Sequence, residues 1–339
     1  MKRLLATLMV LLTVFAVVAC APQAPATPAP AAEAPAEQPA EQPAEQPAEQ
    51  PAAGGTIGVS LYARDQFISN LEQAILKAAE GSGFTVDSQE ANNDTQKQQE
   101  QVRTFALKGY AAIIVNLVDT STAETIIAEA GDTPIIFINR RPVDELLKEG
   151  KYAYVGSQEY DAGKMQAEFL AKYFADKADK TLNYVLFMGQ LGLENTNERT
   201  RSVKEELTKA GFTMNKVFED TAEWDRSKAM DKMQTIIGTG ESFDVVICNN
   251  DEMALGCIEA MKAAGLDLKA IPVVGIDATA MACESVKNGE MAATVFQNAA
   301  AQGQVAMEYA IKAAKGENFD IFGWVPFEPV SIDNVANYM

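Results

Sequence analysis

Polar and aromatic side chains stand directly after several β-rich runs of this chain, where they could hold a small ligand. They are Asp65 and Phe67 after TIGVSLY, Asn139 and Arg140 at the end of PIIFIN, Asn250 at the end of VVICNN, and Asp277 at the end of PVVGID. Carboxylates and amides can each bind two neighbouring hydroxyl groups, and an aromatic ring such as Trp224 can cover the apolar face of a sugar. The same residue types also cap helices and form turns, so each of them alone has a purely structural explanation. Their repetition at four strand ends favours a polyhydroxylated ligand.

The composition excludes much enzyme chemistry. The chain of 339 residues has no histidine, which removes Ser-His-Asp and Cys-His nucleophiles and His-ligated zinc sites. Its 28 Lys and Arg residues stand against 47 Asp and Glu residues, a net charge of -19 that opposes binding to nucleic acid. A glycosidase using Asp65 and Asp277 is the enzyme alternative that remains, because no Walker loop, dinucleotide fingerprint or G-x-S-x-G motif is present. We therefore expect a binding protein, not an enzyme, without cofactor or metal.

The cysteines of the folded part point to buried thiols. Cys248, Cys257 and Cys283 are odd in number, lack C-x-x-C spacing and have apolar neighbours. A bridge between Cys257 and Cys283 stays open as an alternative.

The elements that must position the polar residues alternate between strands and helices. Strands are predicted at 56–62, 84–88, 111–116, 134–139, 152–156, 183–189, 214–220, 245–250 and 272–277, and helices at 66–81, 95–108, 121–130, 159–175, 196–210, 227–237 and up to 264. The strands are apolar on both faces and separated by helices, which indicates parallel, doubly wound sheets, and they are too numerous for one sheet of ordinary size. We predict an α/β protein with two Rossmann-like domains. Ligands of such sheets bind beyond the carboxyl ends of the strands, where the polar residues stand.

The amino terminus predicts export and lipidation. Lys2 and Arg3 precede an apolar run that is short for a membrane span, and the run ends in Val-Val-Ala-Cys20. Residues 1–20 are expected to form a lipoprotein signal whose Cys20 is lipidated, with a simple cleavable signal as the alternative. The Ala, Pro, Glu and Gln tract at 21–53 is expected to act as a tether. The protein would then be anchored to a membrane surface of the bacterial envelope without spanning it.

The segment from Gly55 to Met339 resembles the type I periplasmic sugar-binding proteins, and among them the galactose- and glucose-binding members. The stretches that carry the resemblance are IGVSLYARDQF, NLVDTSTAETII, PIIFINRRP, GQLGLENTNERT, DTAEWDRSKAMDKM, VVICNNDEMALGCIEAMKAAG, IPVVGIDA and AATVFQNAAAQ. The resemblance implies a periplasmic binding protein type I fold, with two lobes joined by a three-strand hinge.

Residue roles follow from the resemblance by position. It implies that Asp65 accepts hydrogen bonds from sugar hydroxyls while Phe67 and Trp224 stack on the two faces of the ring. The other polar positions that match or neighbour the family's ligand contacts are Asn139, Arg140, Asn195, Arg199, Asn250, Asp277 and Gln297.

Three positions depart from the family. Leu193 and Asn195 replace a histidine and an aspartate, and Gln297 replaces an asparagine, in what we expect to be the selective part of the pocket. The family's calcium loop is replaced by the shorter, basic KADKTLN at 177–183, so no calcium is expected there, and Asp244 alone does not make a site.

Lobe boundaries also follow from the resemblance, with crossings near Ser157, Gln297 and Trp324. The expected amino-terminal lobe comprises 54–157 and 297–324, and the carboxy-terminal lobe comprises 158–296 and 325–339.

The resemblance implies capture of a hexose such as glucose or galactose in the interdomain cleft, by hinge closure. The expected partners of this monomer are the membrane subunits of an ABC-type sugar permease and, as a further prediction, a chemoreceptor. Other ligands stay open: a pentose, inositol, a nucleoside or a quorum-signalling furanose. A structural or adhesive lipoprotein is the remaining alternative. A transcription regulator of this fold is excluded because a signal and tether occupy the place of its DNA-binding domain.

Overall fold

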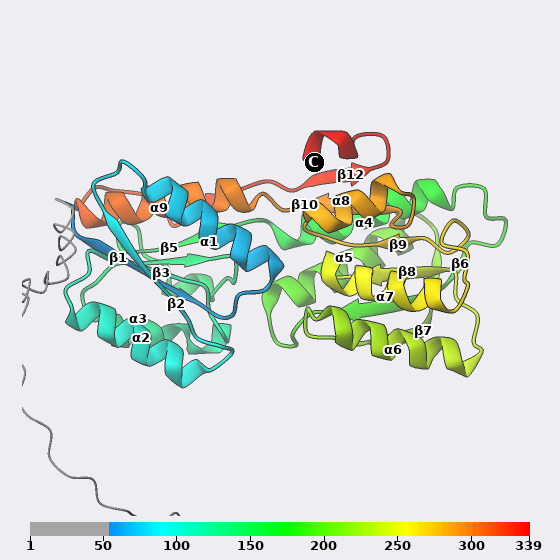
Figure 1. Ribbon diagram of the computed structural model, residues 1–339, viewed down its shortest axis with the longest axis horizontal. Helices are drawn as coiled ribbons and strands as arrows, with labels where there is room; N and C mark the ends of the chain where they lie inside the picture. Colours follow the sequence, from blue (N-terminus) through cyan, green and yellow to red (C-terminus); the bar gives the residue numbers. More distant parts are fainter. Residues whose placement is uncertain (1–53) are drawn as a thin grey trace, which may run out of the picture. The chain divides into compact units, whose positions relative to one another are not determined.

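The protein is built around two six-stranded sheets, each flanked by helices (Figure 1). The computed structural model describes residues 54–339. The predicted α/β class with two doubly wound parallel sheets is confirmed. The chain passes from one sheet to the other after β5 (Tyr152–Gly156), after β10 (Ala293–Phe296) and after β11 (Phe322–Trp324).

The first sheet has the strand order β11-β5-β4-β3-β1-β2, and all its pairs are parallel. Its strands are β1 (Thr56–Leu61), β2 (Thr85–Glu90), β3 (Ala112–Val115), β4 (Ile135–Ile138), β5 (Tyr152–Gly156) and β11 (Phe322–Trp324). Its helices are α1 (Gln66–Ala79), α2 (Thr95–Leu107), α3 (Ala123–Ala130) and α9 (Ala299–Ala314), with short 3-10 turns at Thr120–Thr122 and Asp144–Leu146. Figure 1 shows α9 beside α1, although they are far apart in the sequence.

Alternate residues of the central strands enter two separate hydrophobic clusters. Ile136 and Ile138 of β4 pack with residues of α1 and α9, whereas Ile135 and Phe137 pack with residues of α2 and α3. The sheet is therefore buried on both faces, as its continuous apolar runs predict.

The second sheet has the strand order β12-β10-β9-β8-β6-β7, and β12 is antiparallel to β10. Its strands are β6 (Thr181–Met188), β7 (Thr213–Thr221), β8 (Val245–Cys248), β9 (Val273–Val274), β10 (Ala293–Phe296) and β12 (Glu328–Ser331). The following helices are α4 (Glu159–Tyr173), α5 (Glu194–Lys209), α6 (Arg226–Thr239), α7 (Asp251–Ala263) and α8 (Ala280–Lys287), and a 3-10 turn at Val335–Tyr338 ends the chain. The sequence pattern did not predict helices α8 and α9 or strands β10, β11 and β12. The last strands are short, and α9 is rich in alanine.

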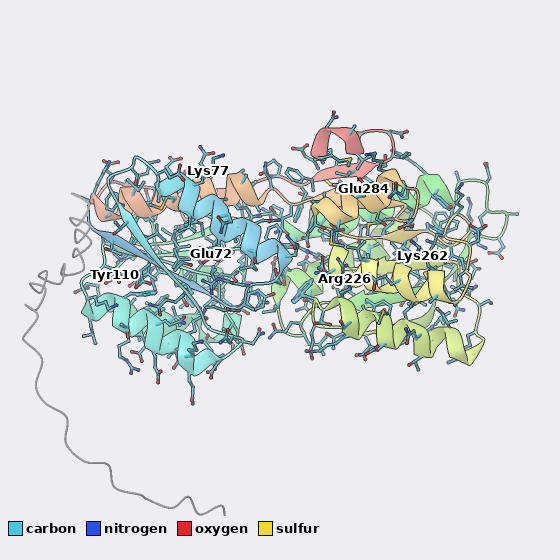
Figure 2. All side chains as sticks on the ribbon, in the orientation of Figure 1. Glu72, Lys77, Tyr110, Arg226, Lys262 and Glu284 are labelled. Carbon is cyan, nitrogen blue, oxygen red and sulfur yellow. The ribbon has the colours of Figure 1, made fainter. Side chains whose placement is uncertain are left out.

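Ion pairs tie helices to their neighbours on both sheets. The Glu72 carboxylate in α1 accepts hydrogen bonds from Arg64 Nε at 2.7 Å and from Ser88 Oγ of β2, and Arg226 Nε at the start of α6 donates to Glu252 of α7 at 3.0 Å. Figure 2 labels Glu72 and Arg226. The exposed pairs contribute about 0 to 1 kcal/mol each, so the apolar clusters carry the fold.

The three cysteines of the described residues are free and buried, and Cys248 Sγ lies 3.9 Å from Cys257 Sγ. The bridge between Cys257 and Cys283 that the sequence left open is therefore absent from this structure.

Within residues 54–339 no helix is long and apolar enough to cross a membrane. The predicted signal, Cys20 and the tether lie outside the described residues.

Candidate ligand-binding site

A cavity lies where the carboxyl ends of strands from both sheets meet. All ten predicted site residues line it, together with Tyr62 and Ile68: Asp65, Phe67, Asn139, Arg140, Asn195, Arg199, Trp224, Asn250, Asp277 and Gln297. The cavity has about 30 Å³ of space, enough for a water molecule, so the polar side chains that line it lie close together.

The carboxylate of Asp65 is fixed by the protein itself. Asp65 is the N-cap of α1, and its Oδ1 accepts the Ile68 amide N–H at 2.8 Å. Its Oδ2 accepts the hydroxyl of Tyr62. Because a carboxylate has about four acceptor positions, Asp65 can still accept from a ligand hydroxyl.

Arg140 is held against the same tyrosine. Its guanidinium carbon lies 3.4 Å from the centroid of the Tyr62 ring, a stacked arrangement, and Nη1 donates to the carbonyls of Leu117 and Val118 at 3.0 and 2.8 Å. Burial lowers the pKa of Arg140, but an arginine stays charged at any pH of interest. Its Nε and Nη2 have no hydrogen bond to other described residues, so they remain available as donors.

The four amides of the cavity all use their oxygen atoms within the protein. Asn139 accepts a hydrogen bond from Asn116 at 3.3 Å, and Asn195 accepts one from the Thr196 backbone amide at 2.9 Å. Asn250 accepts one from the Met253 backbone amide at 3.0 Å, and Gln297 accepts one from Arg199 at 3.1 Å. Each amide therefore has mainly N–H donors left for a ligand. The oxygen atoms of hydroxyl groups are suitable acceptors for them.

Asp277 is the carboxylate without a hydrogen-bond partner. It is 6% exposed and its side chain accepts no hydrogen bond from the described residues; the nearest cation is Arg199, whose Nη1 lies 3.9 Å from Asp277 Oδ1. Burial raises the pKa of the Asp277 carboxyl well above its usual range, and Arg199 counters part of that rise. A ligand hydroxyl that donates to Asp277 would replace the lost hydration.

Trp224 lies flat against the backbone of Gly189. A methyl group added at Gly189 would come within 2.0 Å of Trp224 Cζ2, so only glycine admits the indole in this position. The Trp224 Nε1 atom is buried without a partner among the described residues, and the Trp224 backbone has a φ of 68°.

Backbone strain is concentrated at the cavity. Asn139 and Asp277 also have positive φ values, 64° and 124°. Such conformations cost about 1 to 3 kcal/mol each in residues other than glycine, and they persist where the surroundings impose them, most often at functional sites.

Sequence reasoning missed Tyr62 and Ile68, which line the cavity, and Glu159, which lies behind its wall. Tyr62 ends an apolar run and gave no signal of its own, and Glu159, at the start of α4, is not at the end of a strand. Leu193, expected in the selective part of the pocket, is buried at the start of α5 and does not line the cavity.

The place of the family's calcium loop is filled by protein contacts. Lys177 Nζ lies 3.3 Å from Asp244 Oδ1, and the backbone and side-chain amides of Asn183 donate to Asp244 Oδ2 at 2.7 and 2.8 Å. Asp244 is thus neutralised by a lysine. Among residues 54–339 no cluster of three or more Cys, Asp or Glu residues could hold a metal ion.

Known proteins match most of the chain. A model of the periplasmic binding protein domain matches residues 57–318. A Rhizobium meliloti protein named as a candidate rhizopine-binding protein is 35% identical over 84% of this chain and 92% of its own length. The D-galactose/methyl-galactoside binding periplasmic protein MglB of Haemophilus influenzae is 32% identical over 85% of this chain and 92% of its length.

A solved structure shows the same fold. It is an ABC transporter solute binding protein from Bacillus halodurans with bound myo-inositol, and it matches with a TM-score of 0.77 and 35% identity over 86% of this chain and 99% of that chain. These relatives are binding proteins, and the expectation that this chain is not an enzyme is confirmed. The chain belongs to the periplasmic binding protein family.

Proposed function

We propose that the protein captures a neutral six-membered polyol ring, a cyclitol or a hexose, and delivers it to an ABC-type permease. The arrangement of donors and acceptors carries this proposal. Four amides and two arginines offer N–H groups to the cavity, while Asp65 and Asp277 offer carboxylate oxygens. A hydroxyl group can accept a hydrogen bond from these N–H groups and at the same time donate one to a carboxylate.

Stacking is consistent with a ring-shaped ligand. Phe67 and Trp224 both line the cavity and could cover the apolar faces of a ring bearing hydroxyls at its edge.

A cyclitol of the inositol class is the first candidate. Its support is the 35% identity to the Bacillus halodurans protein whose structure contains myo-inositol. An inositol has a hydroxyl on each ring carbon, so the polar groups around the cavity edge can each find a partner.

A hexose such as galactose or glucose is the second candidate. It is favoured by the 32% identity to the galactose-binding protein of Haemophilus influenzae. Asn195 and Gln297 both stand where the galactose- and glucose-binding members carry other side chains, so we rank the hexose after the cyclitol. A ribose import protein of Bacillus subtilis is 30% identical, which keeps a pentose in the panel of ligands to test.

Closure of two lobes is the proposed means of capture. We assign 54–157 with 297–324 to one lobe and 158–296 with 325–339 to the other, joined by three crossings. Arg141 Nη1 and Glu194 Oε1 come from opposite lobes in this division and lie 3.9 Å apart, a contact that would add to the closed state. A ligand that touches both lobes stabilises the closed form selectively, and the permease can then distinguish loaded from empty protein.

The amino-terminal sequence supports a location at a membrane surface. We propose that Cys20 is lipidated and that 21–53 tethers a monomeric binding domain to a membrane surface of the envelope. A chemoreceptor would be a second protein that recognises the closed form.

Isothermal titration of the purified protein with myo-inositol, galactose, glucose, allose and ribose tests the ligand class. We expect one six-membered ring to bind at micromolar concentration or below, and binding to be weakened strongly in Asp277→Asn. The exposed Asp231→Asn is the matched control and should bind as the wild type does. Binding of none of these compounds would overturn the proposal, whereas binding of ribose alone would reassign the ligand to a pentose.

A further inference from the structure

Glu159 is a buried carboxylate behind the cavity wall. It is 1% exposed, and it does not line the cavity. Its Oε2 accepts a hydrogen bond from Arg199 Nε at 2.6 Å, whereas its Oε1 has no partner among the described residues. A buried charge is stable only when it is paired, so Glu159 and Arg199 depend on each other.

Three of the five N–H groups of Arg199 are used inside the protein. Nε donates to Glu159, one N–H of Nη1 donates to the Asn249 carbonyl at 2.9 Å, and one N–H of Nη2 donates to Gln297 Oε1 at 3.1 Å. One N–H remains on each Nη for a ligand. The plane of a guanidinium is rigid, so these three bonds fix the direction of the two that remain.

The Gln297 amide is oriented by the same chain of contacts. Because its Oε1 is taken by Arg199, its Nε2 is the atom left over, and this Nε2 is buried without a partner. Glu159 therefore acts on two ligand donors through a single guanidinium.

Arg199 also lies near Asp277 without forming a hydrogen bond to it. The guanidinium Nη1 lies 3.9 Å from Asp277 Oδ1, beyond hydrogen-bond distance. Two oppositely charged groups this close would form a direct, charge-assisted hydrogen bond if the arginine were free to move about 1 Å. Such a bond would occupy the carboxylate that a ligand hydroxyl needs.

We propose that Glu159 is a positioning residue that holds Arg199 out of a direct pair with Asp277, so that both groups stay open to the ligand. The proposal rests on the polyol-binding function proposed above. Glu159 contacts no ligand itself, and its effect is exerted through Arg199.

The variant Glu159→Gln tests this without changing the shape of the side chain. In a crystal structure of the ligand-free variant we expect the distance from Arg199 Nη1 to Asp277 Oδ1 to fall from 3.9 Å to about 2.9 Å. Affinity for the ligand of the wild type should fall roughly tenfold. The matched control is Glu168→Gln, an exposed position on the same helix, which should leave both the distance and the affinity unchanged.

An unmoved guanidinium or an unchanged affinity in Glu159→Gln would overturn the proposal. Glu159→Asp provides a second test if the glutamine variant does not fold, because it retains the charge. In Glu159→Asp the distance from Arg199 Nη1 to Asp277 Oδ1 should stay closer to 3.9 Å than to 2.9 Å, and the affinity should fall less than tenfold. A direct Arg199–Asp277 hydrogen bond in this variant, although the charge is retained, would overturn the proposal. The distance does not depend on the identity of the ligand, so a wild-type protein that binds none of the test compounds would refute the proposed function while Glu159 is still tested.

Discussion

The two halves of the cavity differ in how far the protein satisfies its own polar groups. In the half built on the first sheet, Asp65 accepts from Tyr62 and Ile68, and Arg140 donates to two backbone carbonyls. In the half built on the second sheet, the side chain of Asp277 has no hydrogen bond, and Trp224 Nε1 is buried without a partner in the described part of the chain.

This difference assigns different roles to the two halves. A buried polar group without a partner costs about 1 to 3 kcal/mol, a cost that a ligand hydroxyl removes when it binds. Under the proposed function, the first-sheet half would be a prearranged surface, and the second-sheet half would be completed by the ligand. The free energy of binding should come mainly from the second half.

The same substitution made in each half tests this comparison, and the larger effect is expected for Asp277→Asn. Loss of the charge weakens hydrogen bonds from ligand hydroxyls by about 2 kcal/mol, which is roughly 30-fold in affinity. Asparagine tolerates a positive φ, so the backbone at 124° should be retained. Titration calorimetry measures the change, and an effect smaller than that of Asp65→Asn would reverse the assignment of the two halves.

Gly189→Ala should have the next largest effect, because it displaces Trp224 in the second-sheet half. The new methyl group would lie 2.0 Å from Trp224 Cζ2, so the indole must leave its place. We expect about a tenfold loss of affinity, within the range of a lost aromatic contact and a strained neighbour.

Tryptophan fluorescence of Gly189→Ala reports the displacement directly, since Trp224 and Trp324 are the two tryptophans of the chain. A Trp324→Phe background isolates the signal of Trp224. Gly238→Ala is the control, because a methyl group there meets no atom within 4 Å. Unchanged emission with unchanged affinity would show that the indole does not form part of the ligand site.

Asp65→Asn should have a smaller effect on affinity, about fivefold or less. The Asp65 oxygens already accept two hydrogen bonds from the protein, so a ligand hydroxyl gains less there than at Asp277. Asparagine is as good an N-cap as aspartate, and the melting temperature should change by only about 1 °C. A loss equal to that of Asp277→Asn, measured by the same calorimetry, would show that both halves contribute alike.

Much of this site could be predicted from the sequence, for a definite reason. Asn139, Asn250, Asp277 and Trp224 each follow a strand within three residues, and parallel strands bring their carboxyl ends to one edge. Arg199 stands inside α5, at no strand end, and it was the resemblance to a family that placed it.

The support behind the site could not be predicted in this way. Glu159 begins a helix, where an acidic residue is expected on electrostatic grounds alone. Its contact with Arg199 spans 40 residues of sequence and depends on how α4 packs on α5. Likewise, only the three-dimensional contact with the Trp224 indole shows why Gly189 must be a glycine.

The smallest effect is expected from a change of pH. A rise in pH should lower the stability of the ligand-free protein and raise its affinity for the ligand. Burial raises the pKa of Asp277 and of Glu159. Between about pH 4, where carboxyls ionise in the unfolded chain, and the higher pH at which these groups ionise in the folded protein, the folded state holds more protons. Stability of the ligand-free protein should therefore fall as pH rises through this range. The hydrogen bond from Arg64 lowers the pKa of Glu72, so this pair stabilises the fold above the pKa that Glu72 has in the unfolded chain. Its contribution is lost only when the pH falls below that value.

Ligand affinity should rise over the same range, because hydroxyls that donate to Asp277 favour its charged form. We expect the melting temperature without ligand to be about 3 °C higher at pH 5 than at pH 7.5, and the affinity to be a few-fold weaker at pH 5. Asp277→Asn removes one titrating group from the second-sheet half, so both slopes should flatten, whereas Gly238→Ala, which removes no titrating group, should keep both slopes. Unchanged slopes in Asp277→Asn, measured by thermal denaturation and calorimetry, would mean that the ligand does not bind the charged form of Asp277.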